Sequence, residues 1–259
     1  MGHSKTRRHI VIPDTQVRPG VPTSHLAAAG NYIAEWRPEV IVHLGDHWDF
    51  PSLSSHKDLD VLKKGYKADV EAGNEGLRLL TDPWRKIRGY RPRAVLLGGN
   101  HDDYSTKSDN NPGRPARLLI EKAEMREFIS LDDLNFKALG WEYSPFLKPI
   151  QVDGILYAHY FYSPQSGRPY GGTALHKLTK IHQSYTMGHQ QGLDVARVSL
   201  PSGRTIRGTV AGSFYQHEEG YIGPQANSHW RGILVKHGVK DGNFDLMEVS
   251  MEYLLKKYA

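Results

Sequence analysis

The chain has 259 residues, 39% of them hydrophobic, and a formal net charge of +5. It is long enough to bury a sizeable apolar core, and we expect one domain spanning residues 1–259. No run of about twenty apolar residues is present, which excludes a membrane-spanning helix and favours a cytoplasmic location. The absence of cysteine excludes disulfides, thiolate zinc sites and thiol catalysis, so His, Asp, Glu, Asn or Gln must supply any metal ligands.

The charge of the chain gives only weak information about its partner. A pI near 9.2 favours a polyanion, yet the basic residues are spread among 28 acidic residues and form no block. Fourteen histidines exceed the number that an average composition supplies. Because a metal site uses only a few of them, most must be ordinary core or surface residues.

Apolar runs and helix-like stretches alternate through the first hundred residues. The expected elements are a strand at 9–14, a helix near 24–36, a strand at 39–46, a helix near 62–80 and a strand at 93–100. This order is typical of a sheet with a parallel core and helices packed over it, so the expected fold class is α/β. Each strand ends in a polar turn, and in open α/β sheets such turns converge beyond the carboxyl ends of the strands.

The rest of the chain contains fewer helices and becomes rich in strands. The expected elements are a helix at 115–128, a hairpin turning at Asp153-Gly154, a helix near 173–182, a strand at 184–189, hairpins turning at Ser202-Gly203 and Asp241-Gly242, and a short C-terminal helix. The Gly-containing pairs are typical of tight hairpin turns. No repeat or linker interrupts the pattern, which favours two sheets within one domain.

Five turns that follow predicted strands carry side chains able to bind metals. They are Asp14 and Gln16 in PDTQ, Asp46 and Asp49 in GDHWD, Asn100, His101 and Asp102 in GGNHDD, His159 in YAHY, and His189 and Gln191 in MGHQQ. Each has an ordinary interpretation when taken alone, because Asp caps helices, Asn-His occupies turns and a single His is usually structural. Together, such residues at five strand ends are what a site for two divalent cations requires.

This set of motifs resembles that of the calcineurin-like metallophosphoesterases, which usually read D-x-H, GD-x-x-D, GNH-[ED], H and GH-x-H. The likeness runs in the same order from Asp14 to Gln191, about two thirds of the chain, and GD-x-x-D and GNHD are its most specific parts. It implies a sandwich of two β-sheets flanked by helices, in four αββα layers. The D-x-Q variant is similar to members found in bacteriophages, which implies the cytoplasm of a bacterium or of an infected bacterial host.

The resemblance also implies a role for each motif residue. Asp46 would bridge two metal ions. The remaining ligands would be Asn100, His159 and His189 for the second metal, and Asp14, Gln16 and Gln191 for the first. A hydroxide held between the metals would attack phosphorus. His101 would act as the general acid that protonates the leaving oxygen, and Asp49 would orient its imidazole.

Two of the four positions at which the family holds a metal-binding His carry Gln here, and both belong to the first metal. Gln offers a neutral amide oxygen in place of an imidazole nitrogen, which weakens Zn²⁺ or Fe binding and suits Mn²⁺, Mg²⁺ or Ca²⁺. We therefore expect a tight second metal and a weak first one. Mn²⁺ is the favoured ion, with Mg²⁺, Ca²⁺, Zn²⁺ and Ni²⁺ as alternatives. Decay of the site would more readily have removed a carboxylate or His101, and these are retained.

Metal-dependent phosphoester hydrolysis is the function that these residues favour, with a phosphodiester, DNA or RNA as the substrate. His101 matters most when the leaving alkoxide is poor, and a basic protein suits a phosphate backbone. One alternative is a phosphomonoesterase acting on a nucleotide or phosphoprotein. Another is a binding or scaffold protein with a degenerate metal site, supported only by the two glutamines. The sequence does not determine the oligomeric state.

Residues outside the motifs are candidates for substrate contact. The basic ones after the motif turns are Arg18, His56, Lys57, Arg114 and Arg117. Arg114 is the strongest substrate-binding candidate, because it lies in a Gly-Pro loop that opens a helix. The aromatic segment 211–232 would line the cleft if Tyr215, His217 and Trp230 stack on bases. We favour the alternative, a long hairpin loop packed by its own aromatic side chains.

Overall fold

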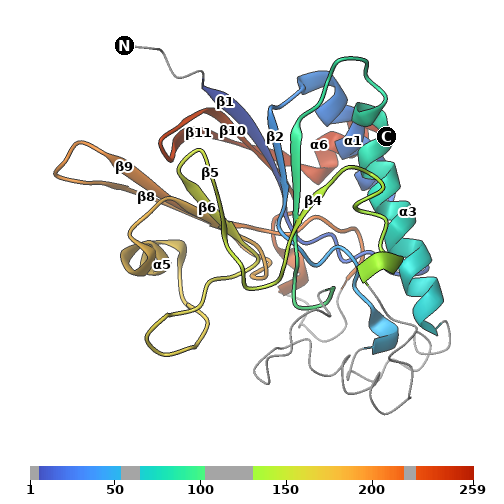
Figure 1. Cartoon of the computed structure of the whole chain (residues 1–259), viewed down its shortest axis with the longest axis horizontal. Coiled ribbons are helices and arrows are strands. Elements are labelled where there is room, and N and C mark those ends of the chain that lie inside the picture. Colours follow the sequence, from blue (N-terminus) through green and yellow to red (C-terminus); the bar gives the residue numbers. More distant parts are fainter. Residues whose placement is uncertain (1–5, 54–64, 103–130, 219–225) are drawn as a thin grey trace.

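The computed structural model describes residues 6–53, 65–102, 131–218 and 226–259. Two sheets and four α-helices form this part of the chain, which confirms a mixed α/β fold with two sheets (Figure 1). The helices are α1 (Ser24–Trp36), α3 (Gly65–Arg85), α5 (Ala174–Ile181) and α6 (Met251–Tyr258). The helix expected at 115–128 lies outside the described residues. Among the helices that are described, none has the length and apolar character needed to cross a membrane.

The first sheet has six strands in the order β11-β10-β1-β2-β3-β4. Their bounds are β1 Arg7–Ile12, β2 Val40–His43, β3 Arg93–Leu97, β4 Glu142–Ser144, β10 Gly232–Lys240 and β11 Asn243–Ser250. Strands β1 to β4 pair in parallel, whereas β10 pairs antiparallel with both β1 and β11. The expected βαβαβ order is therefore confirmed. Strand β4 was not predicted, because its three residues, Glu-Tyr-Ser, form no apolar run.

The second sheet has five strands in the order β5-β6-β7-β9-β8. Their bounds are β5 Ile150–Val152, β6 Ile155–Ala158, β7 Tyr185–Met187, β8 Leu193–Ser199 and β9 Thr205–Ala211. The three predicted hairpins are present. In two of them both central turn residues adopt positive φ, at Asp153-Gly154 (49° and 82°) and Asp241-Gly242 (50° and 81°). This backbone conformation is the reason that Asp-Gly pairs signal such turns.

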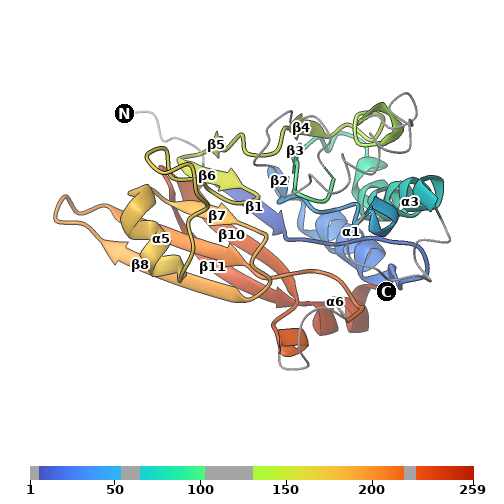
Figure 2. The same ribbon diagram turned by 90° about the horizontal axis from the view of Figure 1, so that it is seen from below.

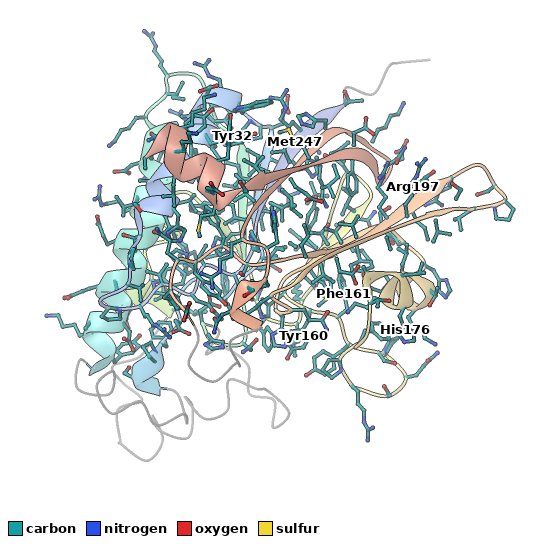
Figure 3. All side chains as sticks on the ribbon, turned by 180° about the vertical axis from the view of Figure 1, so that it is seen from behind. Tyr32, Tyr160, Phe161, His176, Arg197 and Met247 are labelled. Atoms are coloured by element: carbon teal, nitrogen blue, oxygen red, sulfur yellow. The ribbon has the colours of Figure 1, made fainter. Side chains whose placement is uncertain are left out.

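Apolar side chains pack in three layers around the sheets. One cluster fills the space between the two sheets, a second joins the first sheet to α1, α3 and α6, and a third joins the second sheet to α5. Figure 2 shows α5 on the opposite side of the molecule from the other helices. In Figure 3, Tyr32 of α1 lies next to α6 and Phe161 lies beside α5. Both faces of each central strand are therefore covered, and polar groups gather at the strand ends.

The layer between the sheets also contains a lysine. Lys236 on β10 is fully buried, and its ammonium lies 4.8 Å from the ring centroid of Tyr157 and 4.4 Å from that of Phe244. The same ammonium donates a hydrogen bond to the hydroxyl of Thr186. Burial, with a smaller effect from Arg207, lowers the pKa of Lys236 well below its ordinary value.

Replacement of Lys236 by methionine should make the stability of the protein less dependent on pH. Because the pKa of Lys236 is lower in the folded state, the unfolded chain binds more protons, so stability is lost as pH falls below about 10.4 towards the folded pKa. This loss amounts to at most about 1.4 kcal/mol per pH unit. Urea unfolding at pH 7 and pH 9 should give a smaller difference for Lys236→Met than for the wild type. Lys240→Met, at an exposed position of β10, is the control, and equal pH slopes for all three proteins would refute the prediction.

Candidate metal centre

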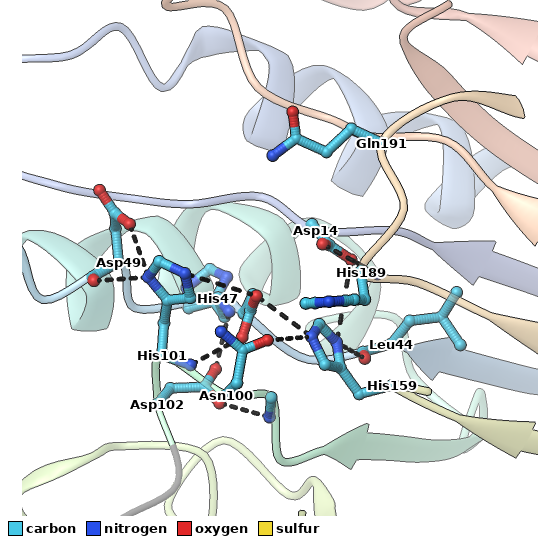
Figure 4. Close-up of polar contacts among 12 residues, drawn as sticks. Asp14, Leu44, His47, Asp49, Asn100, His101, Asp102, His159, His189 and Gln191 are labelled. Carbon is cyan, nitrogen blue, oxygen red and sulfur yellow. Dashed lines mark hydrogen bonds and ion pairs between the residues drawn. The ribbon is translucent and has the colours of Figure 1, made fainter. Parts of the chain in front are cut away.

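The five motif turns meet at one edge of the molecule. Each follows the carboxyl end of a strand, namely β1, β2 and β3 in the first sheet and β6 and β7 in the second. These strands are parallel within each sheet, so their carboxyl ends lie at a common edge. Figure 4 shows Asn100, His101 and His159 pointing towards one another, with Asp14 and His189 beside them.

The centre of the cluster is the imidazole of His159. Its Nδ1 donates a hydrogen bond to the carbonyl oxygen of Leu44 at 2.9 Å, which fixes the ring and turns Nε2 towards the other side. There Nε2 lies 3.2 Å from Oδ2 of Asp46 and 2.9 Å from Oδ1 of Asn100. Asp46, His159 and His189 each offer one ligand atom within 4.8 Å of the others, so this cluster could hold a metal ion.

The cluster contains buried carboxylates, and a nearby positive charge would stabilise their ionised form. Asp14 and Asp46 are both almost completely buried. Burial raises the pKa of Asp14 to about 7; nearby His159 opposes this shift and Asp46 adds to it. Although burial acts in the same direction on Asp46, His159 and His101 hold its pKa below the ordinary range. Burial lowers the pKa of His159, but Asp46 and Asp14 outweigh it and raise that pKa to about 9. A divalent cation would satisfy the same carboxylates, because it takes the position that the Nε2 proton otherwise fills.

The side-chain oxygen of Gln16 is available to bind a metal. Its side chain is 2% exposed, and Oε1 has no hydrogen-bond partner among the residues that the structure describes. The turn is held through its backbone, since the Gln16 N–H donates to the carbonyl oxygen of Asp46 at 2.9 Å. A buried amide oxygen without a partner costs about 1–3 kcal/mol, and a bound cation would remove that cost. The donor set at Asp14 and Gln16 therefore fits a hard, oxygen-preferring metal.

Gln191 is placed differently from the other predicted ligands. Figure 4 shows its side chain lying apart from Asp14 and His189. Its Oε1 accepts a hydrogen bond from the hydroxyl of Tyr215. The adjacent Gln190 is also held, because its Oε1 accepts from Nζ of the buried Lys177 at 2.7 Å. The ligand role of Gln191 remains a prediction, and it requires the side chain to leave Tyr215.

His101 faces the cluster from the other side and is supported by Asp49. Its Nδ1 lies 3.0 Å from Oδ1 of Asp49 and 3.1 Å from the carbonyl oxygen of the same residue. Its Nε2 lies 4.0 Å from Oδ2 of Asp46. Against the lowering effect of burial, Asp46 and then Asp49 raise the pKa of His101 well above its ordinary value. With Nδ1 engaged by Asp49, Nε2 is the ring nitrogen that faces the cluster.

Of the five basic residues predicted to contact substrate, only Arg18 lies within the described residues. Arg18 donates a hydrogen bond to Oδ2 of Asp49 at 3.1 Å, so it supports the His101 pair. Arg114, the strongest candidate, lies outside the described residues together with His56, Lys57 and Arg117.

The aromatic segment follows the interpretation that we favoured from the sequence. The ring of Tyr215 is buried and stacks on His217 with centroids 4.6 Å apart, and the Arg231 guanidinium covers it at 4.7 Å. Trp230 packs against the cluster between the sheets. The described part of the segment is therefore packed by its own aromatic side chains, although residues 219–225 lie outside the described ranges.

Several residues to which sequence reasoning gave no role support the cluster. Asp102, present in the GNHD motif but without an expected role, accepts hydrogen bonds from the backbone N–H groups of Gly99 at 2.6 Å and His47 at 2.7 Å. The ring of Tyr160 packs on His189 with centroids 4.6 Å apart. Tyr160 directly follows His159, and His47 directly follows Asp46, so proximity to a motif was the only signal available in the sequence.

A glycine in the third motif makes room for Asp46. A Cβ at Gly99 would lie 2.0 Å from Oδ1 of Asp46 and 2.3 Å from its backbone nitrogen, so Gly99→Ala must displace the carboxylate. We expect this variant to bind Mn²⁺ about 10- to 100-fold more weakly, the usual cost of disturbing the support of a metal ligand. Gly192→Ala is the control, because nothing lies within 4 Å of its added Cβ. Calorimetric titration of both variants decides the matter, and equal Mn²⁺ affinities would contradict the prediction.

No protein-family model matches the sequence, and a search of curated proteins found no match. The resemblance to metallophosphoesterases therefore depends on the sequence motifs alone.

Proposed function

We propose that the protein is a metallophosphoesterase that hydrolyses phosphodiesters, with nucleic acid as the leading candidate substrate. The observation that carries this proposal is the juxtaposition of the Asp46–His159–His189 cluster with His101, whose Nε2 is 4.0 Å from Oδ2 of Asp46 and whose Nδ1 is 3.0 Å from Oδ1 of Asp49. A set of metal ligands beside a proton donor is the minimal equipment for cleaving a phosphoester with a poor leaving group. Two sheets with helices on their outer faces support the αββα arrangement that this family implies.

The chain offers ligands for two cations of unequal affinity. Asp46, Asn100, His159 and His189 would hold the tighter one, and Asp14 and Gln16 would contribute to the weaker one, with Gln191 joining if it leaves Tyr215. A bound divalent cation would polarise the phosphoryl oxygens and lower the pKa of a bound water. The oxygen-rich first site favours Mn²⁺, with Mg²⁺, Ca²⁺, Zn²⁺ and Ni²⁺ as alternatives.

The residues of the chain itself would orient the substrate and supply a proton. His101 would donate its Nε2 proton to the leaving oxygen, since that nitrogen faces the cluster and Nδ1 is engaged by Asp49. Arg18 would keep the Asp49 carboxylate ionised and in place through its 3.1 Å hydrogen bond. A phosphomonoesterase could use the same groups. Retention of the linked Arg18–Asp49–His101 set argues against a protein that only binds.

The test of this function is hydrolysis by chelator-stripped protein. A generic phosphodiester and the matching phosphomonoester would be titrated separately with Mn²⁺, Mg²⁺, Ca²⁺, Zn²⁺ and Ni²⁺. We expect diester turnover that rises with Mn²⁺ up to high concentration, because the first site is weak. Turnover of the monoester alone would favour the phosphomonoesterase. No turnover of either substrate with any metal would refute the enzymatic proposal and favour a binding role.

Restoring the more usual ligand should strengthen the weaker site. Gln16→His replaces a buried amide oxygen by an imidazole nitrogen, a better ligand for Mn²⁺ and especially for Zn²⁺. We expect the weaker site to tighten by about tenfold, which corresponds to about 1.4 kcal/mol. Gln151→His, at an exposed position of β5, is the control. If calorimetry shows unchanged stoichiometry and affinity for Gln16→His, the ligand role of Gln16 is wrong.

A further inference from the structure

A buried hydrogen-bonded chain lies beside the metal ligands and takes no part in the roles described above. Thr15 stands between Asp14 and Gln16, and its side chain points to two histidines of the GDHWD turn region. Oγ1 of Thr15 lies 2.7 Å from Nδ1 of His47 and 3.1 Å from Nε2 of His43. All three side chains are at most 1% exposed.

Backbone groups fix both ends of this hydrogen-bonded chain, so each imidazole proton and the hydroxyl proton of Thr15 has one permitted position. The N–H of Gly45 donates to Nδ1 of His43 at 3.2 Å, so a neutral His43 carries its proton on Nε2 and donates it to the Thr15 hydroxyl. At the other end, Nε2 of His47 must donate to the carbonyl oxygen of Gly73 at 2.9 Å. Its Nδ1 then accepts the single hydroxyl proton of Thr15.

The hydrogen-bonded chain joins three segments that lie far apart in the sequence. His43 and His47 enclose the turn that carries Asp46, Thr15 belongs to the turn that carries Asp14, and Gly73 lies in α3. Backbone hydrogen bonds also link the two turns, from Gln16 N–H to the carbonyl oxygen of Asp46 at 2.9 Å and from Val17 N–H to that of His47 at 2.7 Å. The Thr15 hydroxyl is a fully buried side-chain link between them, in addition to the Arg18–Asp49 ion pair, and its contact through His47 ends on α3.

We propose that Thr15 is a positioning residue that sets the separation of the Asp14 and Asp46 carboxylates through its ordered hydrogen bonds to His43 and His47. Loss of the hydroxyl leaves a buried donor on His43 and a buried acceptor on His47 without a partner, so the two turns must move to satisfy them. The consequence for metal affinity rests on the proposed function, whereas the order of the protons does not.

The proton order is tested first, on the metal-free protein. Long-range ¹H–¹⁵N spectra distinguish the two neutral tautomers of each histidine ring. We expect His43 and His47 both to carry the proton on Nε2 at neutral pH, and Thr15→Ser to preserve this pattern because it keeps the hydroxyl. A wild-type His47 with its proton on Nδ1 would overturn the proposed chain.

The positioning role is tested by Mn²⁺ affinity. We expect Thr15→Val to weaken Mn²⁺ binding by about 10- to 100-fold and Thr15→Ser to restore most of it. Thr81→Val is the matched control, because Thr81 is also fully buried and its hydroxyl accepts a hydrogen bond from Trp141 at 2.9 Å, yet it belongs to the buried face of α3 and not to a motif turn. Thr81→Val should lose stability without losing Mn²⁺ affinity.

The outcomes separate this inference from the proposed function. Mn²⁺ affinity of Thr15→Val equal to that of Thr81→Val would overturn the positioning role while the function stands. Wild-type protein that binds neither Mn²⁺ nor Mg²⁺, Ca²⁺, Zn²⁺ or Ni²⁺ would refute the function and the effect on affinity together. The tautomer pattern of the metal-free protein would then still decide whether the ordered chain exists.

Discussion

Replacement of His101 by alanine should slow phosphodiester hydrolysis by about 10²- to 10⁴-fold while the protein keeps its metal. The imidazole points Nε2 towards Asp46, at 4.0 Å from Oδ2, and contacts Asp49 through Nδ1, an arrangement that we propose serves protonation of the leaving oxygen rather than ligation. The loss should be largest for a diester with an alkyl leaving group, which needs a proton, and smaller for one that releases a nitrophenolate. Steady-state kinetics on both substrates measures this difference.

Metal analysis of the same variant separates the role of an acid from that of a ligand. His101→Ala should retain the metal content of the wild type, and His176→Ala, at an exposed position of α5, should be unchanged in both activity and metal content. Loss of metal in parallel with activity would mean that His101 is a ligand. An equal loss of rate for both leaving groups would mean that His101 does not protonate the leaving oxygen.

Replacement of Asp46 by asparagine should abolish tight metal binding. Asp46 is the carboxylate to which His159 and His101 both turn, and its Oδ1 also accepts the backbone N–H of His101 at 3.0 Å. Asparagine has nearly the same shape but removes the negative charge, so the turn should persist while Mn²⁺ affinity falls by at least about 100-fold. Calorimetric titration measures the affinity, and diester turnover should be lost with it.

The control for this variant is Asp245→Asn, which removes an acidic charge at a side chain that is 92% exposed on β11. It should bind Mn²⁺ as the wild type does. If Asp46→Asn kept wild-type Mn²⁺ affinity, the metal would lie elsewhere and the central ligand assignment would be wrong.

Local signals were sufficient to predict most of the described fold. Strands of buried apolar residues, the alternation of strands with helices, and Asp-Gly turns are all properties of short segments, and they predicted the order of elements. The helix near 62–80 was predicted to end too early. In the structure α3 continues through Pro83 to Arg85, although the proline cannot donate the backbone hydrogen bond of its position, and Pro83 packs against α1 at Gly30.

The candidate site was predictable only as a set of positions. Because Asp14, Asp46 and His159 follow strand ends, their backbones lie at one edge of the sheets regardless of the direction in which their side chains point. The direction of a side chain depends on partners from distant segments, as when Tyr215 holds Gln191 or Asp49 holds Arg18. Residues of ordinary type, such as Thr15 and His47, gain their importance from contacts that no local pattern encodes.

An anomalous-difference map from crystals soaked in Mn²⁺ would test the central claim most directly. We predict a strong peak bonded to Asp46, His159 and His189, and a weaker peak beside Asp14 and Gln16 that grows with Mn²⁺ concentration. A crystal with no peak at Asp46, or with Mn²⁺ bound only elsewhere, would contradict the assignment of this cluster as a metal centre.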